Sequence, residues 1–384
     1  MRLTKLILEQ FRNYQNLELN FDPNENISYI VGPNAQGKTN ILESIYLLAL
    51  TKSFRTSQQQ DMIRWGDEFA RVQGFFEVED AVTQLEAFLG LPPNPQKSFK
   101  KNGVKTSAAD FIGNCQIVFF HPEDLNMLYL GPDLRRAYLN VINVQVNRKY
   151  FSALRSYQKV LKQRNALLHA IKEGRAMPSA QREGEGVPAL AGRRSVQIEQ
   201  LNIWDAQLVE FGTYLMQERA ATVEYFQKNL TKTYQKISQG DEKITITYRH
   251  TEDFSRALAS ARPRDLRALI TTVGPHRDDL EFSLNGLKLS ALASRGEYRS
   301  LLLSLKLIEL KFFEDRTTQK PILLLDDVFS ELDPHRQQML LQAIEGRQTI
   351  ITATHLDNVD PLDARQHSGL GSALKIQYYH EKLR

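Results

Sequence analysis

The segment GPNAQGKT, residues 32–39, matches the pattern G-x-x-x-x-G-K-[ST], which binds nucleotide phosphates. It follows an apolar run ending at Val31 and opens a helical pattern, the context that this motif requires. Its glycines let backbone N–H groups approach phosphate oxygens, its lysine contacts the β- and γ-phosphates, and its last hydroxyl binds Mg²⁺. The sequence therefore predicts a triphosphate and Mg²⁺ site formed by Gly32, Pro33, Asn34, Ala35, Gln36, Gly37, Lys38 and Thr39.

Two carboxylates follow a second apolar run, in the segment ILLLDD. A phosphate loop needs a further carboxylate for Mg²⁺, at the end of a buried strand. The four aliphatic residues predict such a strand. We assign Asp326 to Mg²⁺, through a water molecule, and Asp327 to the general base that polarises the attacking water. The alternative is that both carboxylates only cap the helix that follows.

A third segment, ASRGEYRS, precedes a leucine-rich helical pattern over residues 301–308. Ser294 is a typical helix N-cap, which is the simplest interpretation of this segment. A helix N-terminus also presents free N–H groups to an anion. Ser294, Gly296 and Glu297 are therefore candidate phosphate contacts.

Two more polar residues lie near the ends of predicted elements. Asp333 precedes Pro334 in SELDPHRQ, a plausible helix start, and His355 ends the strand pattern in ITATHLD. A histidine beside the nucleotide is suited to sense the γ-phosphate. An isolated histidine of this kind is more often a surface or core residue, so its assignment depends on the other motifs.

The order of these motifs resembles that of ABC-type ATPase heads, in the branch that includes SMC and RecF proteins. Further segments narrow the resemblance to the RecF recombination-mediator family, from residue 1 to about residue 360: LEQFRNY, GKTNILESIYLLALTKSFRTS, FFHPEDLNMLYLGPDLRRAYLN, TTVGPHRDDL, SRGEYRS and LLLDDVFSELD. The resemblance implies that ATP is the nucleotide. It also implies an ATP-dependent homodimer in which Ser294 and Gly296 cap the γ-phosphate bound by a second subunit. Arg12 and Asn13 would approach the nucleotide from the adenine or ribose side.

The fold class that the resemblance implies is α/β. It is an ABC-type ATPase head, with a P-loop mixed sheet and an antiparallel β subdomain, plus an inserted helical lobe. We expect lobe I with the phosphate loop in residues 1–120 and a helical lobe II with a hairpin arm in 121–275. Residues 276–384 would complete the head. The stretch EGRAMPSAQREGEGVPALAGRRS is interpreted as a loop at the arm tip, and DDLEFSLNGLKLSALA as a hairpin with its turn at Asn285-Gly286.

The family resemblance implies a role in recombinational repair and replication-fork recovery. The ATP-gated dimer would bind DNA at single-strand gaps and ss–ds junctions. With RecO and RecR it would help to load the recombinase RecA, in the RecFOR pathway and in SOS induction. Ala35, Tyr298 and Asp327 depart from Gly, Gln and Glu that are common in related proteins. Because aspartate is one methylene shorter than glutamate, we expect weak, DNA-stimulated ATP hydrolysis that releases the DNA. The region 119–124 is the candidate for a Q-loop.

DNA-contacting residues are less clearly marked by the sequence. Basic residues flank a predicted Asn102-Gly103 hairpin turn, follow the first helix and lie at the arm tip: Lys97, Lys100, Lys101, Lys105, Lys52, Arg55, Arg64, Arg193 and Arg194. They are interpreted either as an ordinary solvated surface or as a DNA face. The sequence shows no base-reading motif, so we expect binding to phosphates without sequence preference.

Composition limits the other function classes. The chain has 384 residues, a net charge of +4 and one cysteine, which excludes an internal disulfide. Its apolar runs are shorter than the roughly 18 residues of a membrane span. We therefore expect no membrane partner and a cytoplasmic, nucleoid-associated protein.

Four alternatives remain open at this point. The chain could be the ATPase head of another SMC-like DNA-maintenance complex, or a transporter engine. In transporter engines, the segment that corresponds to residues 294–297, called the signature segment, follows the phosphate-loop lysine after far fewer residues than Gly296 follows Lys38 here. A head attached to a nuclease would need a further acidic metal site. A nucleotide-binding scaffold without turnover would release no phosphate.

Overall fold

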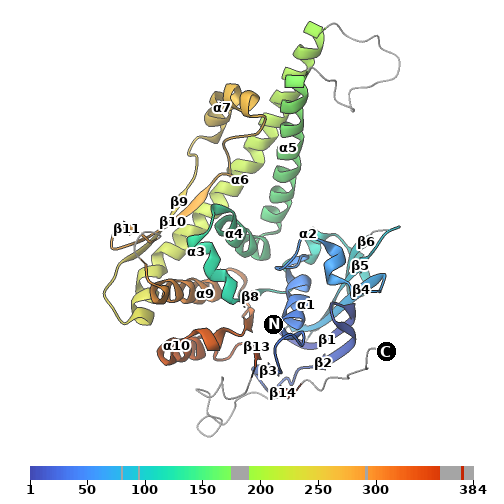
Figure 1. Ribbon diagram of the computed structural model, residues 1–384, viewed down its shortest axis with the longest axis vertical. Helices are drawn as coiled ribbons and strands as arrows, with labels where there is room; N and C mark the ends of the chain where they lie inside the picture. Colours follow the sequence, from blue (N-terminus) through green and yellow to red (C-terminus); the bar gives the residue numbers. More distant parts are fainter. Residues whose placement is uncertain (79–80, 94–95, 174–189, 290–292, 355–372, 376–384) are drawn as a thin grey trace.

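A computed structural model describes residues 1–78, 81–93, 96–173, 190–289, 293–354 and 373–375. Figure 1 shows two sheet-containing parts at one end of the molecule and a helical arm that projects away from them. The expected α/β head with a helical insertion is confirmed by this arrangement.

The five-stranded sheet brings together both ends of the chain. Its order is β14-β3-β13-β12-β8, and every neighbouring pair is parallel. The strands are β3 (Ile27–Val31), β8 (Ile117–Phe120), β12 (Ile322–Asp326), β13 (Thr349–Ala353) and β14 (Ala373–Lys375). Because parallel strands end at one edge, residues that follow β3, β8, β12 and β13 lie near each other, where ligands bind in such sheets.

A separate six-stranded antiparallel sheet has the order β2-β1-β4-β5-β6-β7. Its strands are β1 (Arg2–Phe11), β2 (Tyr14–Asn20), β4 (Phe69–Val78), β5 (Ala81–Gly90), β6 (Gln96–Lys101) and β7 (Val104–Thr106). The predicted turn at Asn102 and Gly103 joins β6 to β7, and both residues have positive φ. This sheet is the expected antiparallel β subdomain.

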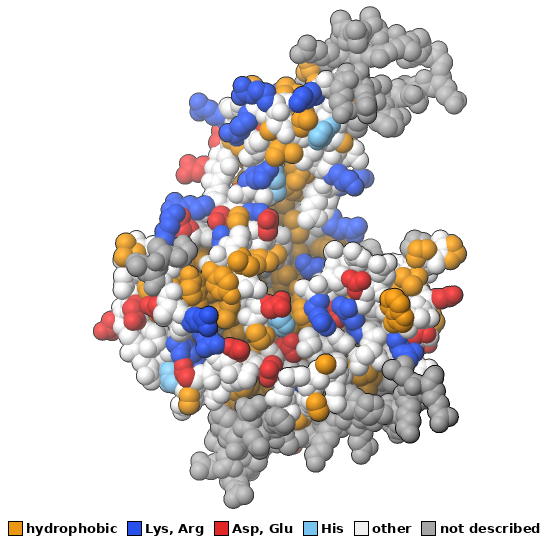
Figure 2. Space-filling model, in the orientation of Figure 1, with side chains coloured by type: hydrophobic (Ala, Val, Ile, Leu, Met, Phe, Trp, Pro, Cys, Tyr) orange, Lys and Arg blue, Asp and Glu red, His pale blue; other side chains and the backbone are white. Residues whose placement is uncertain are grey.

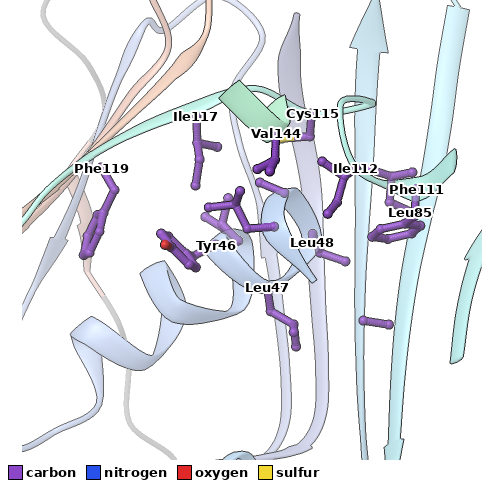
Figure 3. Close-up of a cluster of buried hydrophobic side chains, with 14 of the residues drawn as sticks. Tyr46, Leu47, Leu48, Leu85, Phe111, Ile112, Cys115, Ile117, Phe119 and Val144 are labelled. Carbon is purple, nitrogen blue, oxygen red and sulfur yellow. The ribbon is translucent and has the colours of Figure 1, made fainter. Parts of the chain in front are cut away.

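Helix α1 (Lys38–Leu50) follows the phosphate loop and fills the space beside the antiparallel sheet. Figure 3 shows Tyr46, Leu47 and Leu48 of α1 among buried side chains of β5, β8 and the segment after β7. A Cβ at Gly74 of β4 would lie 2.7 Å from a methyl carbon of Leu48. The absence of a side chain at residue 74 therefore lets α1 pack closely on β4, which fixes the start of the helix relative to the sheet.

The short helix α2 (Ala108–Phe111) precedes β8, and the helical part begins after β8 with the 3₁₀ turn Pro122–Leu125, the short helix α3 (Asn126–Tyr129) and the longer α4 (Pro132–Val146). The arm consists of α5 (Arg148–Glu173), α6 (Leu190–Ser238) and α7 (Phe254–Ala268). Inside it, the fully buried guanidinium of Arg164 pairs with Asp205 and Asp265, at 2.6 and 2.7 Å. The predicted loop between α5 and α6 falls largely outside the described residues.

The remaining elements connect the arm back to the head. Strands β9 (Ile244–Arg249), β10 (Asp279–Leu284) and β11 (Leu287–Lys288) form a small sheet, with the predicted turn at Asn285 and Gly286. Helix α9 (Arg295–Thr317) packs on α6, and α10 (Pro334–Ile344) packs on α9. Within the described residues, no helix has the length and apolar character of a membrane span.

Candidate nucleotide-binding site

The phosphate loop lies between β3 and α1, as predicted, and its backbone has two left-handed residues. Gly37 has a φ of 94° and Ala35 a φ of 65°. A Cβ on Gly37 would lie 2.5 Å from the side-chain amide of Asn13, so only glycine fits there. Ala35 adopts its left-handed conformation despite its Cβ, which costs free energy that a glycine would not. The loop therefore tolerates the departure at residue 35, as expected.

Asn13 supports the phosphate loop from the turn between β1 and β2. Its Nδ2 donates to the Gln36 carbonyl at 3.2 Å, and its Oδ1 accepts from Asn40 Nδ2 at 2.8 Å. Arg12 lies beside it, but its guanidinium donates to both carboxylate oxygens of buried Glu43, at 2.8 and 2.6 Å. Both residues line the pocket described below. Their contact with an adenine or ribose stays a prediction.

Lys38 is almost fully buried, and its ammonium lies inside the loop. Nζ donates to the carbonyls of Gly32 and Pro33, at 2.7 and 2.9 Å. Burial lowers the pKa of Lys38, while the carboxylates of Asp327 and Asp326 act in the opposite direction. The predicted lysine and the predicted aspartates are therefore close enough to interact electrostatically.

Asp326 ends β12, and its carboxylate accepts hydrogen bonds from hydroxyl groups of two other elements. Thr39 Oγ1 of α1 lies 2.9 Å from Oδ1 and 3.0 Å from Oδ2, and Thr352 Oγ1 of β13 donates to Oδ1 at 2.7 Å. The carboxylate is thus positioned between the phosphate loop and the neighbouring strand. Sequence reasoning paired Thr39 with Asp326 but missed Thr352, because a buried strand threonine gives no motif.

His121, which follows β8, also reaches Asp326. Its Nε2 lies 3.4 Å from Oδ2 of the carboxylate. Its Nδ1 accepts the backbone N–H of Glu123 at 3.1 Å, so in the neutral ring Nε2 carries the hydrogen and faces Asp326. The segment 119–124 is the predicted Q-loop region, and its residue His121 contacts the Asp326 carboxylate.

Asp327 lies one residue beyond β12 and has a φ of 51°. Its backbone N–H donates to Thr352 Oγ1 at 3.0 Å, which holds the turn on the neighbouring strand. Burial and the adjacent Asp326 carboxylate raise the pKa of Asp327. Asp327 is followed by a short 3₁₀ turn (Val328–Glu331) and not by a long helix, and its side chain makes no N-cap hydrogen bond. The side chain therefore does not act as a helix cap.

A pocket of about 1330 Å³ extends from these residues. Its lining includes Lys38, Thr39, His121, Asp326 and Asp327, together with residues 60, 61 and 63–67 and Leu91. This volume exceeds the 300–1,000 Å³ that is usual for small-molecule sites. Ser294, Gly296, Glu297 and Asp333 do not line it.

The signature segment, residues 294–297, lies at the N-terminus of α9. Ser294 Oγ accepts the N–H of Glu297 at 3.3 Å, and Glu297 Oε2 accepts the N–H of Ser294 at 2.6 Å. The simplest interpretation, a helix cap, is therefore confirmed. Ser294 is also exposed, and a Cβ on Gly296 would meet no atom closer than 3.7 Å. Packing within one chain does not require glycine at residue 296.

Asp333 lies with the signature segment and not with the phosphate loop. It caps α10 by accepting the N–H of Arg336 at 3.0 Å, and it pairs with the guanidinium of the same arginine. Arg336 Nη2 also donates to the Gly296 carbonyl at 3.1 Å. The four predicted residues 294, 296, 297 and 333 thus form one group. His355, the predicted γ-phosphate sensor, lies outside the described residues.

Several basic residues that the sequence suggested as DNA contacts already have partners. Lys100 pairs with Glu86 at 2.8 Å, and Lys101 donates to Asn114 at 2.6 Å. Arg55 lines the nucleotide pocket and donates to Asn40 at 2.8 Å. Arg64 also lines it. The side chains of Arg193 and Arg194 lie outside the described residues.

Comparison with known proteins identifies the family. The model for the RecF/RecN/SMC N-terminal domain matches residues 2–365. A protein of Lachnoclostridium phytofermentans, named DNA replication and repair protein RecF, is 37% identical and covers 93% of this chain and 94% of its own length. A protein of the same name from Halalkalibacterium halodurans is 36% identical, over 94% of both chains.

Solved structures give the same result. A structure of the recombination mediator RecF with ATP, described as part of the RecFOR pathway, has a TM-score of 0.79, 33% identity and 92% coverage of both chains. The Smc head of Pyrococcus furiosus has a TM-score of 0.50 and 16% identity, over 93% of this chain and 91% of its own, which supports the fold alone. The chain therefore belongs to the RecF family of DNA replication and repair proteins, and it has the ABC-type ATPase fold.

Proposed function

We propose that this chain is an ATP-dependent, DNA-binding homodimer of recombinational repair, in which each subunit completes the other's nucleotide site. One observation carries the proposal. The signature segment is exposed at the N-terminus of a long helix, with free space at Gly296, yet it does not line the pocket that contains Lys38. A helix N-terminus favours a phosphate. A second subunit would bring its phosphate there.

The residues at the end of β12 fit Mg²⁺. Thr39 and Asp326 place hydroxyl and carboxylate oxygens within 3.0 Å of each other, and such hard oxygen ligands suit this ion. No group of three or more His, Cys, Asp or Glu among the described residues forms a metal site by itself. Phosphate oxygens and water would therefore complete the coordination. Bound Mg²⁺ would neutralise charge on the β- and γ-phosphates.

Slow hydrolysis follows from the side chain of Asp327. Burial and the adjacent Asp326 carboxylate raise its pKa, which makes it a stronger base than an ordinary aspartate, while Lys38 acts in the opposite direction. Its short side chain holds the attacking water less well than a glutamate. We propose that hydrolysis is weak, stimulated by DNA, and releases the dimer.

The described structure favours helix α5 as a DNA-contacting surface. Its sequence contains no acidic residue before Glu173, and Figure 2 shows Lys and Arg side chains on the arm. Four of its exposed basic residues recur at helical spacing, Arg148, Arg155, Lys159 and Lys162, although Arg148 also lies 3.8 Å from Asp110. Contacts of this type neutralise phosphates without reading bases, so affinity would fall steeply with salt.

The biological setting comes from the relatives. One related structure is described as RecF in the RecFOR pathway, and related proteins are named for DNA replication and repair. We propose that the ATP-bound dimer binds gaps and ss–ds junctions at the nucleoid. There it would act with RecO and RecR to load RecA. The loading of RecA would also underlie SOS induction.

Sedimentation velocity tests the proposal. We expect monomers without nucleotide or with ADP, dimers with ATP, and dimer-bound duplex or gapped DNA only with ATP. Single-turnover phosphate release, with and without DNA, measures the hydrolysis. Dimers that form without nucleotide would contradict the proposal that ATP controls dimerisation. If no phosphate is released with or without DNA, the protein binds ATP but does not hydrolyse it.

Paired charge changes test the DNA surface. Lys159→Glu with Lys162→Glu should lower DNA affinity and flatten its salt dependence, while ATP-dependent dimers persist. Lys100→Glu, a change at a lysine that pairs with Glu86, is the matched control. If the control weakens DNA binding more than the α5 changes do, the β6–β7 turn is the DNA face instead.

A further inference from the structure

The nucleotide pocket is lined by the most exposed large hydrophobic side chain among the described residues. Trp65 has 97% of its surface exposed, compared with 70% for Val104, the next in order. Single exposed hydrophobic residues are common on protein surfaces. Trp65 differs from the others because it lines the same pocket as Lys38 and Thr39.

Trp65 lies at the tip of a rigid turn. The N–H of Asp67 donates to the carbonyl of Arg64 at 3.1 Å, and Arg64 Nη1 also pairs with the Asp67 carboxylate at 3.2 Å. Gly66, the third residue of the turn, has a φ of 92°, which suits glycine at this position. The indole is therefore held by its backbone and not by side-chain packing.

The same turn is attached to the support of the phosphate loop. The N–H of Arg12 donates to the carbonyl of Met62 at 3.0 Å, and the N–H of Arg64 donates to the carbonyl of Gln10 at 2.8 Å. Asn13, the residue after Arg12 in the turn between β1 and β2, donates to the Gln36 carbonyl of the phosphate loop. A continuous set of hydrogen bonds thus fixes Trp65 relative to the loop that binds phosphates.

We propose that Trp65 is the stacking surface for the base of the nucleotide. The inference rests on the proposed function, since it requires a nucleotide at Lys38. With the triphosphate held by the phosphate loop, the base and ribose extend along the pocket towards residues 60–67 and Leu91. An indole stacks on any base and reads no hydrogen-bonding edge. Trp65 therefore strengthens purine binding without separating adenine from guanine.

Fluorescence of Trp65 tests this contact directly. The chain has two tryptophans, and Trp204→Phe leaves Trp65 as the only one. ADP and pyrophosphate are matched probes, because both lack a γ-phosphate and so leave the chain monomeric under the proposed function. We expect ADP to change the Trp65 emission and pyrophosphate to compete with ADP without changing it.

Affinity measurements on the full chain give a second test. Trp65→Ala should weaken ADP binding between about fivefold and about 150-fold, the usual range for one stacked base, and leave pyrophosphate binding unchanged. Trp65→Phe should recover more affinity than Trp65→Leu, and Val104→Ala is the exposed apolar control.

Three results would overturn the inference. Equal ADP affinity in wild type and Trp65→Ala would show that Trp65 does not contact the base, and it would leave the proposed function intact. A Trp65 signal that appears only with ATP and rises with protein concentration would show that the indole contacts the second subunit. Failure of both ADP and pyrophosphate to bind would remove the phosphate-loop assignment, and this inference with it.

Discussion

Thr39 Oγ1 lies 2.9 Å and 3.0 Å from the two carboxylate oxygens of Asp326, although 287 residues separate them in sequence. The contact joins the first turn of α1 to the end of β12. Thr352 and His121 reach the same carboxylate from β13 and from the segment after β8. Groups from three parallel strands and from the first turn of α1 therefore meet at the two carboxylate oxygens of Asp326.

Asp326→Asn should uncouple nucleotide binding from Mg²⁺. The amide retains the shape of the side chain but is a poor ligand for a hard cation, and its neighbours Thr39 and Thr352 would have to reorient. We expect ATP affinity to fall by tenfold or more in Mg²⁺ and to change little in EDTA. The exposed change Asp133→Asn is the control. If the Mg²⁺ dependence of ATP binding is unaltered, Asp326 does not contribute to Mg²⁺ binding.

Asp327→Asn should slow hydrolysis and lengthen the life of the dimer. Loss of a general base usually costs a factor of about 10²–10⁴, so single-turnover phosphate release should fall by roughly 10²-fold at least. Asp327→Glu should be faster than wild type, because the longer carboxylate reaches the water better. A normal rate in the asparagine variant would show that another group activates the water.

Lys306→Met should destabilise the whole chain. Nζ donates to the Phe119 carbonyl at 2.5 Å and lies 3.0 Å from Asp124, and Glu309 is buried beside it. Burial raises the pKa of Glu309 to about 7, which shows how poorly this carboxylate is solvated. Removing the cation of such a pair costs about 3–5 kcal/mol, measurable by urea unfolding.

The double variant Lys306→Met with Glu309→Gln is the partner experiment. Removing both charges should restore a large part of the stability, because the buried carboxylate of Glu309 is then no longer left unpaired. Asp124, the other partner of Lys306, is 29% exposed and can be solvated by water. If the double variant is less stable than Lys306→Met alone, the loss comes from packing and the ion pair is not its cause.

Stability should decrease in mild acid because of His276. Burial lowers the pKa of His276 to about 4, and its ring bonds the Tyr157 hydroxyl at 2.6 Å and the Thr271 carbonyl at 2.9 Å. The unfolded chain binds this proton at higher pH than the folded chain. The free energy of unfolding therefore falls as pH decreases from about 6.5 to 4, by roughly 3 kcal/mol.

His276→Gln provides the comparison for that pH profile. The amide cannot take up the proton, so the variant should be less stable at neutral pH and show a flatter dependence between pH 6.5 and 4. Thermal unfolding across this range measures both profiles. Parallel profiles for the two proteins would assign the acid sensitivity to other groups.

The phosphate loop and the double aspartate were predictable because each is local. Gly37, Lys38 and Thr39 are adjacent in sequence, and an apolar run indicates the strand before each motif. The helix cap of Ser294 and Glu297 was also visible from their spacing. For the same reason, the hairpin turns at Asn102-Gly103 and Asn285-Gly286 were correct.

Contacts between distant segments were not predictable. Nothing in the sequence shows that Glu86 pairs with Lys100, or that Arg55 donates to Asn40 in the pocket. From the sequence, Lys100 and Arg55 were candidates for a DNA face or for an ordinary solvated surface. Thr352 and Trp65 belong to no motif, and His121 was part of the Q-loop region without being singled out. The places of all three follow from strand order and from the hydrogen bonds of a turn. The sequence motifs locate the phosphates, while the fold locates the rest of the pocket.

Mixing two inactive variants tests the shared-site model most directly. The Lys38→Ala variant should bind no ATP, but its signature segment is unchanged and can still cap the phosphate of a partner. Ser294→Arg should bind ATP as a monomer but block the phosphate of a partner. Neither variant alone should form dimers with ATP. In a mixture, one complete site forms from Lys38 of one chain and Ser294 of the other.

We expect sedimentation of differently labelled chains to show ATP-dependent heterodimers in that mixture, at up to half the wild-type nucleotide content. Monomers throughout the mixture, under conditions where wild type dimerises, would contradict the model. So would ATP-induced dimers of Ser294→Arg by itself, because they would form without a signature segment over the γ-phosphate.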